Sequence, residues 1–145
     1  MIPWKKKGFA VTPSPVTIFV LDDDSSVRSA LARLLKAKGF AEQQLDSLAS
    51  LRAALPLPPD SCLLVDVVLD QESGLDVPAM LSDRNEMVPV VFMSATDDEE
   101  KLAKADTTGA TRCLRKPFEA EELFAALEAA ISACRHAPDL DLEKE

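Results

Sequence analysis

Cysteine is scarce in this sequence, and long hydrophobic runs are missing. The three cysteines, Cys62, Cys113 and Cys134, are odd in number, lie far apart and form no CxxC pair. This usage indicates neither a disulfide framework nor a zinc site, and it fits a reducing cytoplasm, where we expect the protein to act. No uninterrupted apolar stretch approaches about eighteen residues, so we expect no membrane-spanning segment and no membrane partner.

Basic residues are in the minority. The chain has 16 Lys and Arg against 25 Asp and Glu, a formal net charge of −9 at pH 7. Because binding to phosphate backbones needs a basic surface, nucleic acid is not expected as a partner. The 145 residues suffice for one domain with its own core. We expect a flexible leader over residues 1–15, the domain over 16–135, and an acidic, frayed tail over 136–145.

Strand-like and helix-like segments alternate along residues 16–135. Buried strands are predicted at 16–21, 61–65, 88–93 and 111–114, and a more polar edge strand at 40–45. Apolar residues recur at helical spacing within 27–35, 48–55, 75–81 and 123–134. Thr96 and Glu99 have the spacing of a capping box for a further helix, which Gly109 ends. Strands alternating with helices predict a parallel sheet with helices on both faces.

Polar side chains follow four of the predicted strands, at the point where each strand ends. They are Asp22, Asp23 and Asp24, then Asp66, Ser94 and Lys116. In an open parallel sheet, ligands bind beyond the carboxyl ends of the strands, so these residues form the candidate site. Two of the first three aspartates, together with Asp66, offer the oxygen ligands that Mg²⁺ prefers. Asp24 is expected to cap the following helix instead.

Four stretches resemble the response-regulator receiver domains of bacterial two-component systems. They are VLDDDSSVRSALARLLKAKGF (20–40), LLVDVVLDQESGLDV (63–77), PVVFMSA (89–95) and LRKPF (114–118). The resemblance covers nearly all of residues 16–135. It implies an α/β fold like that of the chemotaxis regulators: a single flavodoxin-like, doubly wound domain with five helices and a five-stranded parallel sheet of order 2-1-3-4-5.

The resemblance also implies roles for the carboxylates. Asp66 matches the aspartate that accepts a phosphoryl group from the phosphohistidine of a sensor histidine kinase or a phosphotransfer protein. Asp22 and Asp23 match the acidic pair that holds Mg²⁺ together with Asp66 and the backbone carbonyl of Val68. The metal would neutralise charge on the transferring phosphoryl oxygens, which is the main task in phosphoryl transfer.

Lys116 and Ser94 complete the implied switch. Lys116 matches the lysine that neutralises phosphoryl charge, and Ser94 matches the hydroxyl that moves to bond the phosphoryl group. The protein is then expected to be a signalling switch that catalyses only its own phosphoryl transfer and dephosphorylation. An output protein is expected to bind the face formed by the fourth helix, the last strand and the last helix. Formation of a homodimer is a further possibility. That face carries Lys101, Lys104, Arg112, Arg115 and Glu122.

Three positions depart from the family pattern. Cys113 stands where relatives have an aromatic residue, and the chain has no tyrosine, so we expect signalling through Ser94 without a ring flip. Val68 stands where a side chain can position an attacking water, so we expect a long-lived acyl phosphate. Asp70 replaces a common proline, so we expect a more mobile and more acidic loop after Asp66.

Other functions stay open at this point. Asp22 and Asp24 have the DxD spacing of a phosphohydrolase of the haloacid-dehalogenase type, although Asp66 would then be unexplained. A flavodoxin-like binder of flavin or nucleotide needs a Gly- or Thr-rich phosphate loop, which the sequence lacks after the first strand. A degenerate receiver would bind its partner constitutively. Because few residues follow the last predicted helix, we expect a stand-alone receiver, a phosphorelay intermediate or an excised fragment.

Overall fold

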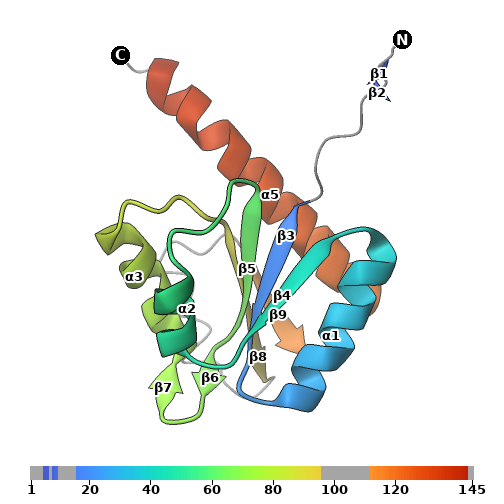
Figure 1. Cartoon of the computed structure of the whole chain (residues 1–145), viewed down its shortest axis with the longest axis vertical. Helices are drawn as coiled ribbons and strands as arrows, with labels where there is room; N and C mark the ends of the chain where they lie inside the picture. The colour runs from blue at the N-terminus through green and yellow to red at the C-terminus, as the bar shows by residue number, and fades with distance from the viewer. Residues whose placement is uncertain (1–4, 7, 10–15, 96–111, 144–145) are drawn as a thin grey trace.

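A five-stranded sheet runs through the middle of the molecule (Figure 1). The computed structural model describes residues 5–6, 8–9, 16–95 and 112–143. The strands stand in the order β4-β3-β5-β8-β9, and every neighbouring pair is parallel. Counted along the chain within this sheet, that order is 2-1-3-4-5, so the predicted fold is confirmed. The strands are β3 (Thr17–Leu21), β4 (Ala41–Leu45), β5 (Ser61–Asp66), β8 (Val90–Ala95) and β9 (Arg112–Lys116).

Helices cover both faces of this sheet (Figure 1). The helices α1 (Ser25–Lys38) and α5 (Ala120–Glu143) pack on one face, and α2 (Leu48–Ala54) and α3 (Val77–Asp83) pack on the other. Successive side chains of a strand point to opposite faces. In β3, Ile18 and Val20 therefore join the cluster under α1 and α5, while Phe19 and Leu21 join the cluster under α2 and α3. Burial on both sides explains why this strand is an apolar run rather than an alternating one.

Capping residues set the ends of the helices near the sheet. Asp24 caps α1, because its side chain accepts hydrogen bonds from the backbone N–H groups of Ser26 and Val27. Gly39 ends α1 in the left-handed conformation with φ 108°, and its N–H reaches the last carbonyls of the helix. Pro78 lies in the first turn of α3, where no N–H is needed. The cap at Asp24 was predicted from the sequence.

Some predicted segments differ in the structure or lie outside the described residues. The helix expected to start at Thr96 and end at Gly109 lies outside the described residues. The last helix runs past residue 135 to Glu143, so most of the segment predicted as an acidic tail is part of α5. That segment contains no glycine, and its one proline removes a single helical hydrogen bond, which bends a helix without having to end it. In the predicted leader, β1 (Lys5–Lys6) and β2 (Gly8–Phe9) pair antiparallel in a sheet of their own.

A short hairpin after β5 is the remaining unpredicted element. It consists of β6 (Val68–Leu69) and β7 (Glu72–Ser73), which pair antiparallel and lead into a 3-10 turn at Gly74–Asp76. The carboxylate of Glu72 accepts a hydrogen bond from the N–H of Leu48 at 3.2 Å, which ties the hairpin to the start of α2. Among the helices that the structure describes, none has the length and apolarity needed to cross a membrane.

Candidate functional site

Three charged side chains converge at the carboxyl edge of the sheet, the edge where α1 begins and the β6–β7 hairpin lies (Figure 1). The Nζ atom of Lys116 lies 2.7 Å from Oδ2 of Asp66 and 3.8 Å from Oδ2 of Asp22. The three residues come from the ends of β9, β5 and β3, which the parallel register brings to one edge. One ammonium group therefore faces two carboxylates, as the positions in the sequence predicted.

Asp22 has a buried carboxylate, and one of its two oxygens has no hydrogen-bond partner among the described residues. Its residue is 1% exposed, and its Oδ1 accepts a hydrogen bond from the N–H of Asp24 at 2.9 Å. Its Oδ2 is buried and has no hydrogen-bond partner among the described residues. Burial is the largest cause that raises the pKa of Asp22 from 3.8 to about 6, and the charge of Asp66 adds to it, while the Asp24 N–H and Lys116 oppose it. An additional positive charge next to Oδ2 would favour the ionised form.

Asp66 lies beside Lys116 with both of its carboxylate oxygens engaged. Its Oδ1 accepts a hydrogen bond from the N–H of Val68 at 2.9 Å, and its Oδ2 accepts one from Lys116. Its side chain is 13% exposed, so an incoming group can reach it. Burial works to lower the pKa of Lys116, but the hydrogen bond and the charges of the two aspartates outweigh it and raise that pKa. The ammonium group therefore stays charged at neutral pH.

Gly74 allows the loop after β5 to pass directly beside Asp66. Its N–H donates to the carbonyl of Val67 at 2.8 Å. A Cβ atom at this position would overlap the carbonyl oxygen of Asp66 and lie 2.7 Å from Cγ1 of Val65. Glycine is needed here because backbone approaches backbone, and its φ is not in the left-handed region. The loop after Asp66 is therefore tight at Gly74.

The other predicted site residues lie at the same edge of the sheet, outside the group of three charged side chains. Asp23 is exposed, next to Asp22. Ser94 is fully buried at the end of β8, where its hydroxyl donates to the carbonyl of Ala95 at 3.3 Å. The side chain of Val68 is exposed and its N–H is used by Asp66, while the role of its carbonyl stays a prediction.

The donor set suits a magnesium ion better than a metal that needs many protein ligands. Over the described residues, no group of three or more His, Cys, Asp or Glu side chains is arranged to hold a metal ion. Mg²⁺ commonly uses one or two carboxylates and keeps several waters. The unpartnered Oδ2 of Asp22 and the neighbouring carboxylate of Asp66 meet that requirement. The residues present therefore fit the expected ion.

Sequence reasoning missed one residue that touches this site, Arg28. Its Nη1 donates to the backbone carbonyl of Asp22 at 2.6 Å. Arg28 is the fourth residue of α1, and a cation close to a helix N-terminus is electrostatically unfavourable. That unfavourable placement was the available signal that this arginine has a specific partner.

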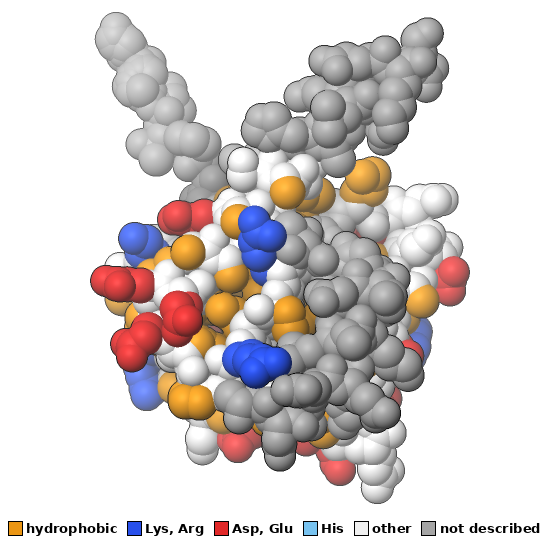
Figure 2. Space-filling view, turned by 180° about the vertical axis from the view of Figure 1, so that it is seen from behind, with side chains coloured by type: hydrophobic (Ala, Val, Ile, Leu, Met, Phe, Trp, Pro, Cys, Tyr) orange, Lys and Arg blue, Asp and Glu red, His pale blue; other side chains and the backbone are white. Residues whose placement is uncertain are grey.

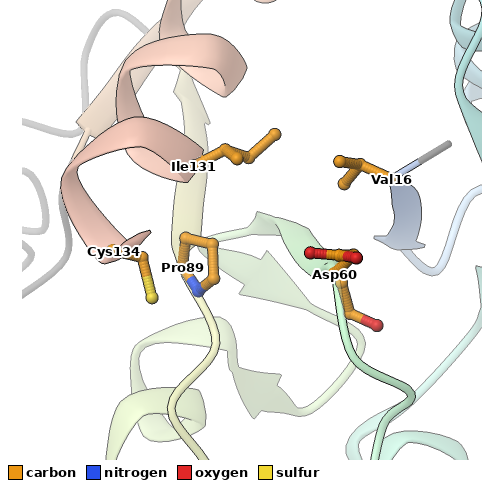
Figure 3. Close-up of a pocket in the computed structure, with 6 residues that line it drawn as sticks. Val16, Asp60, Pro89, Ile131 and Cys134 are labelled. Carbon is orange, nitrogen blue, oxygen red and sulfur yellow. The ribbon is translucent and has the colours of Figure 1, made fainter. Parts of the chain in front are cut away.

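A small pocket lies at the opposite edge of the sheet, where the strands begin (Figure 3). It encloses about 160 Å³ and is lined by Val16, Asp60, Ser61, Pro89, Ile131 and Cys134. Ligand pockets usually enclose roughly 300–1,000 Å³. Its small size and its distance along the strands from the charged cluster make the carboxyl edge the candidate functional site.

Comparison with known proteins decides the family. The sequence pattern of the response regulator receiver domain matches residues 18–128, most of the chain and all three members of the charged cluster. The chain belongs to the response regulator receiver domain family. This receiver domain is 34% identical to the response regulator protein TodT of Pseudomonas putida over 114 residues, which are 79% of this chain and 50% of TodT. It is 32% identical to the transcriptional regulatory protein TdiR of Thauera aromatica over 134 residues, 92% of this chain and 59% of TdiR.

Solved structures agree with that assignment. The crystal structure of FixJ-N superimposes with a TM-score of 0.78 at 27% sequence identity, covering 83% of this chain and 96% of FixJ-N. The receiver domain therefore spans nearly the whole of FixJ-N but only about half of TodT.

Proposed function

We propose that this receiver accepts a phosphoryl group on Asp66 from the phosphohistidine of a sensor histidine kinase or a phosphotransfer protein. The observation that carries the proposal is the position of Lys116, whose ammonium group lies between the carboxylates of Asp66 and Asp22. Such a cluster at the carboxyl edge of a parallel sheet is suited to phosphoryl transfer, where positioning and charge neutralisation do most of the work.

In the proposed reaction, a carboxylate oxygen of Asp66 attacks the phosphorus atom. A P–O bond forms, the P–N bond to the histidine breaks, and its electron pair leaves with the imidazole, so that an acyl phosphate results. The N–H of Val68 holds one oxygen of Asp66 and Lys116 holds the other, which fixes the plane of the attacking group. Lys116 also brings a full positive charge to the phosphoryl oxygens, because its pKa is raised.

Mg²⁺ belongs to this proposal. Asp22, Asp23, Asp66 and the carbonyl of Val68 would hold the ion, which supplies further neutralisation of phosphoryl charge when bound. The buried, unpartnered Oδ2 of Asp22 supports this assignment. Ser94 would then serve as the switch hydroxyl, since its hydroxyl donates to the carbonyl of the next residue at 3.3 Å, the long end of the hydrogen-bond range.

A protein is the proposed partner on both the input and the output side. An apolar pocket of about 440 Å³ opens beside Lys116, lined by side chains such as Leu31, Met93 and Phe118, and offers a docking place for the phosphohistidine-bearing protein. On the face that Figure 2 views, the basic side chains that are drawn in colour stand apart from one another, and the net charge of −9 does not favour nucleic acid as a partner. The output protein would bind the face that includes β9 and α5.

We further propose that the receiver acts in the cytoplasm as a switch whose only catalysis is its own phosphoryl transfer and dephosphorylation. The test is intact mass after incubation with acetyl phosphate, with and without Mg²⁺. One phosphoryl adduct that requires Mg²⁺ and disappears in Asp66→Asn is the expected result. Asp70→Asn is the matched control, because it removes an exposed carboxylate four residues away and should still be labelled.

Two outcomes would contradict the proposal. An adduct that persists in Asp66→Asn would place the phosphoryl group elsewhere. No adduct in the folded wild type, from acetyl phosphate and from a cognate phosphorylated kinase alike, would favour a receiver that signals by contact alone. Repeated turnover of a small phosphate ester, in place of stoichiometric labelling, would favour the phosphohydrolase alternative.

A further inference from the structure

We propose that Arg28 is a positioning residue for the acidic pair: its guanidinium group fixes the peptide of Asp22 and thereby sets the affinity of the site for Mg²⁺. This inference rests on the proposed function, because it concerns the same metal site. It adds a residue of α1 that does not itself reach the ion or the phosphoryl group.

The contacts of Arg28 close the loop that carries the acidic pair. Its Nη1 donates to the carbonyl of Asp22 at 2.6 Å, and its backbone N–H donates to the carbonyl of Asp24 at 3.0 Å. The loop between β3 and α1 is therefore held at both of its ends by one residue. Hydrogen bonds that involve a charged group are shorter and stronger than neutral ones, and the distance to Asp22 is at the short end.

With that bond in place, Asp22 has a single free acceptor. Its N–H donates to the carbonyl of Leu45 at 3.2 Å, its carbonyl is taken by Arg28, and its Oδ1 is taken by the N–H of Asp24. Only Oδ2, which is buried and faces Lys116, has no hydrogen-bond partner among the described residues. The direction of Oδ2 follows from these three bonds, so loss of the Arg28 bond loosens the one atom that is available to a cation.

Arg28 is a poor choice for stability alone. Its Nε is buried without a hydrogen-bond partner among the described residues, and an unsatisfied buried donor is unfavourable. Its charge also lies in the first turn of α1, where the helix dipole disfavours a cation. A methionine, which has a similar helix propensity, would avoid both costs. Residues that go against local preferences, as Arg28 does here, are expected at functional sites. The favourable contribution of the arginine is its hydrogen bond to the carbonyl of Asp22.

The positioning role predicts a specific kinetic pattern. Among the described residues, the hydrogen bonds of Arg28 go to Asp22 and Asp24 and not to Asp66 or Lys116, so the phosphoryl-transfer step at saturating Mg²⁺ should change little without it. The Mg²⁺ concentration needed for half-maximal labelling should rise, because the geometry of Asp22 is less well fixed. A merely structural role would lower thermal stability and leave this Mg²⁺ midpoint where it was.

The experiment compares Arg28→Met, Arg28→Lys and, as matched control, Arg33→Met on the exposed side of the same helix. Isothermal titration of the unphosphorylated protein with MgCl₂ gives the Mg²⁺ affinity, and labelling by acetyl phosphate at several Mg²⁺ concentrations gives the midpoint. We expect Arg28→Met to weaken Mg²⁺ binding about tenfold, the lower end of the range for residues that orient metal ligands. Arg28→Lys should recover most of the affinity, since its ammonium group can donate to the same carbonyl.

Each result separates this inference from the proposed function. Wild type that fails to bind Mg²⁺ overturns the proposed function and this inference together. Wild type that binds Mg²⁺ with the same affinity as Arg28→Met overturns the positioning role alone, as does equal weakening in Arg33→Met. If Arg28→Met does not fold, Arg28→Gln provides the same comparison, and unchanged Mg²⁺ affinity in that variant overturns the inference.

Discussion

At the scale of single residues, the protonation of Asp22 links the site to folding. Its pKa is raised from 3.8 to about 6, chiefly by burial, so the folded chain binds this proton more tightly than the unfolded chain does. The stabilising contribution of the proton is fully present below about pH 4 and is lost as the pH rises through 6. At neutral pH, without a metal, the folded protein carries the cost of a buried carboxylate.

Replacing Asp22 with asparagine should therefore stabilise the fold at neutral pH. The asparagine oxygen can keep the hydrogen bond from the N–H of Asp24, and its amide removes the buried charge. A shift of about two pKa units corresponds to roughly 3 kcal/mol, so we expect a gain of about 1–3 kcal/mol in the free energy of unfolding at pH 7.5. Urea unfolding in EDTA at several pH values measures it, with Asp23→Asn as the exposed control.

The pH profile is the decisive part of that measurement. The gain from Asp22→Asn should shrink between pH 6 and pH 4, because the wild-type carboxyl becomes protonated over this range. A gain that stays constant from pH 4 to pH 7.5 would contradict a buried, titrating Asp22.

Gly74 gives a second prediction at this scale. Gly74→Ala places a methyl group against the carbonyl of Asp66 and the side chain of Val65, so the backbone must shift. We expect a loss of more than about 2 kcal/mol in the free energy of unfolding, as for overpacking in a rigid core, and displacement of Asp66 with loss of labelling. Gly39→Ala is the comparison, since its Cβ meets no atom within 4 Å and its cost comes only from the positive φ, roughly 1 kcal/mol. Equal costs for the two variants would show that the contact with Asp66 is unimportant.

At the scale of elements, Asp24 has a different role from Asp22 and Asp23, because it caps a helix. Its side chain caps α1 through hydrogen bonds of 2.9 and 3.3 Å to the N–H groups of Ser26 and Val27. Asp24→Ala should lower the free energy of unfolding by about 1 kcal/mol, the usual cost of losing an N-cap, and should leave labelling of Asp66 intact. Asp23→Ala should do the reverse, impairing Mg²⁺-dependent labelling at little cost in stability. Denaturant unfolding and mass analysis of both variants check this, and loss of labelling in Asp24→Ala would make Asp24 part of the site.

The elements that the sequence could predict are those with strong local signals. Buried strands such as Ser61–Asp66 contain a continuous apolar run, here residues 62–65, and Asp24 is an ordinary helix N-cap. The β6–β7 hairpin could not be predicted in this way, because strands of two residues have no periodicity. Its turn also uses Gln71 at φ 61°, where glycine or asparagine would be the usual signal.

The candidate site was predictable in part for a related reason. Residues at strand ends are placed by the sheet, so Asp22, Asp66 and Lys116 can be grouped from the sequence. Arg28 could not, because its contact depends on a side chain reaching back six residues to a backbone oxygen. Residue patterns describe which face a side chain occupies, but they do not describe its hydrogen-bond partner.

At the scale of the whole molecule, the site exists only when the sheet is complete. Asp66 and Lys116 are 50 positions apart in the chain, and Asp22 reaches them from a third strand. The unfolded chain cannot hold these groups together, so an ion that binds them binds the folded state alone. Its binding free energy is then added to the stability of the entire domain.

Magnesium should accordingly raise the melting temperature of the wild type and not that of Asp22→Asn. At a free Mg²⁺ concentration ten times the dissociation constant, linkage gives about 1.4 kcal/mol of stabilisation. Because the chain has a net charge of −9, added salt also screens general repulsion, so NaCl of equal ionic strength is the necessary control. The Mg²⁺ effect should weaken at pH 5, where a proton competes for Asp22. Equal shifts in wild type and Asp22→Asn would mean that Mg²⁺ acts only as a screening salt, and the carboxyl edge would lose its assignment as a metal site.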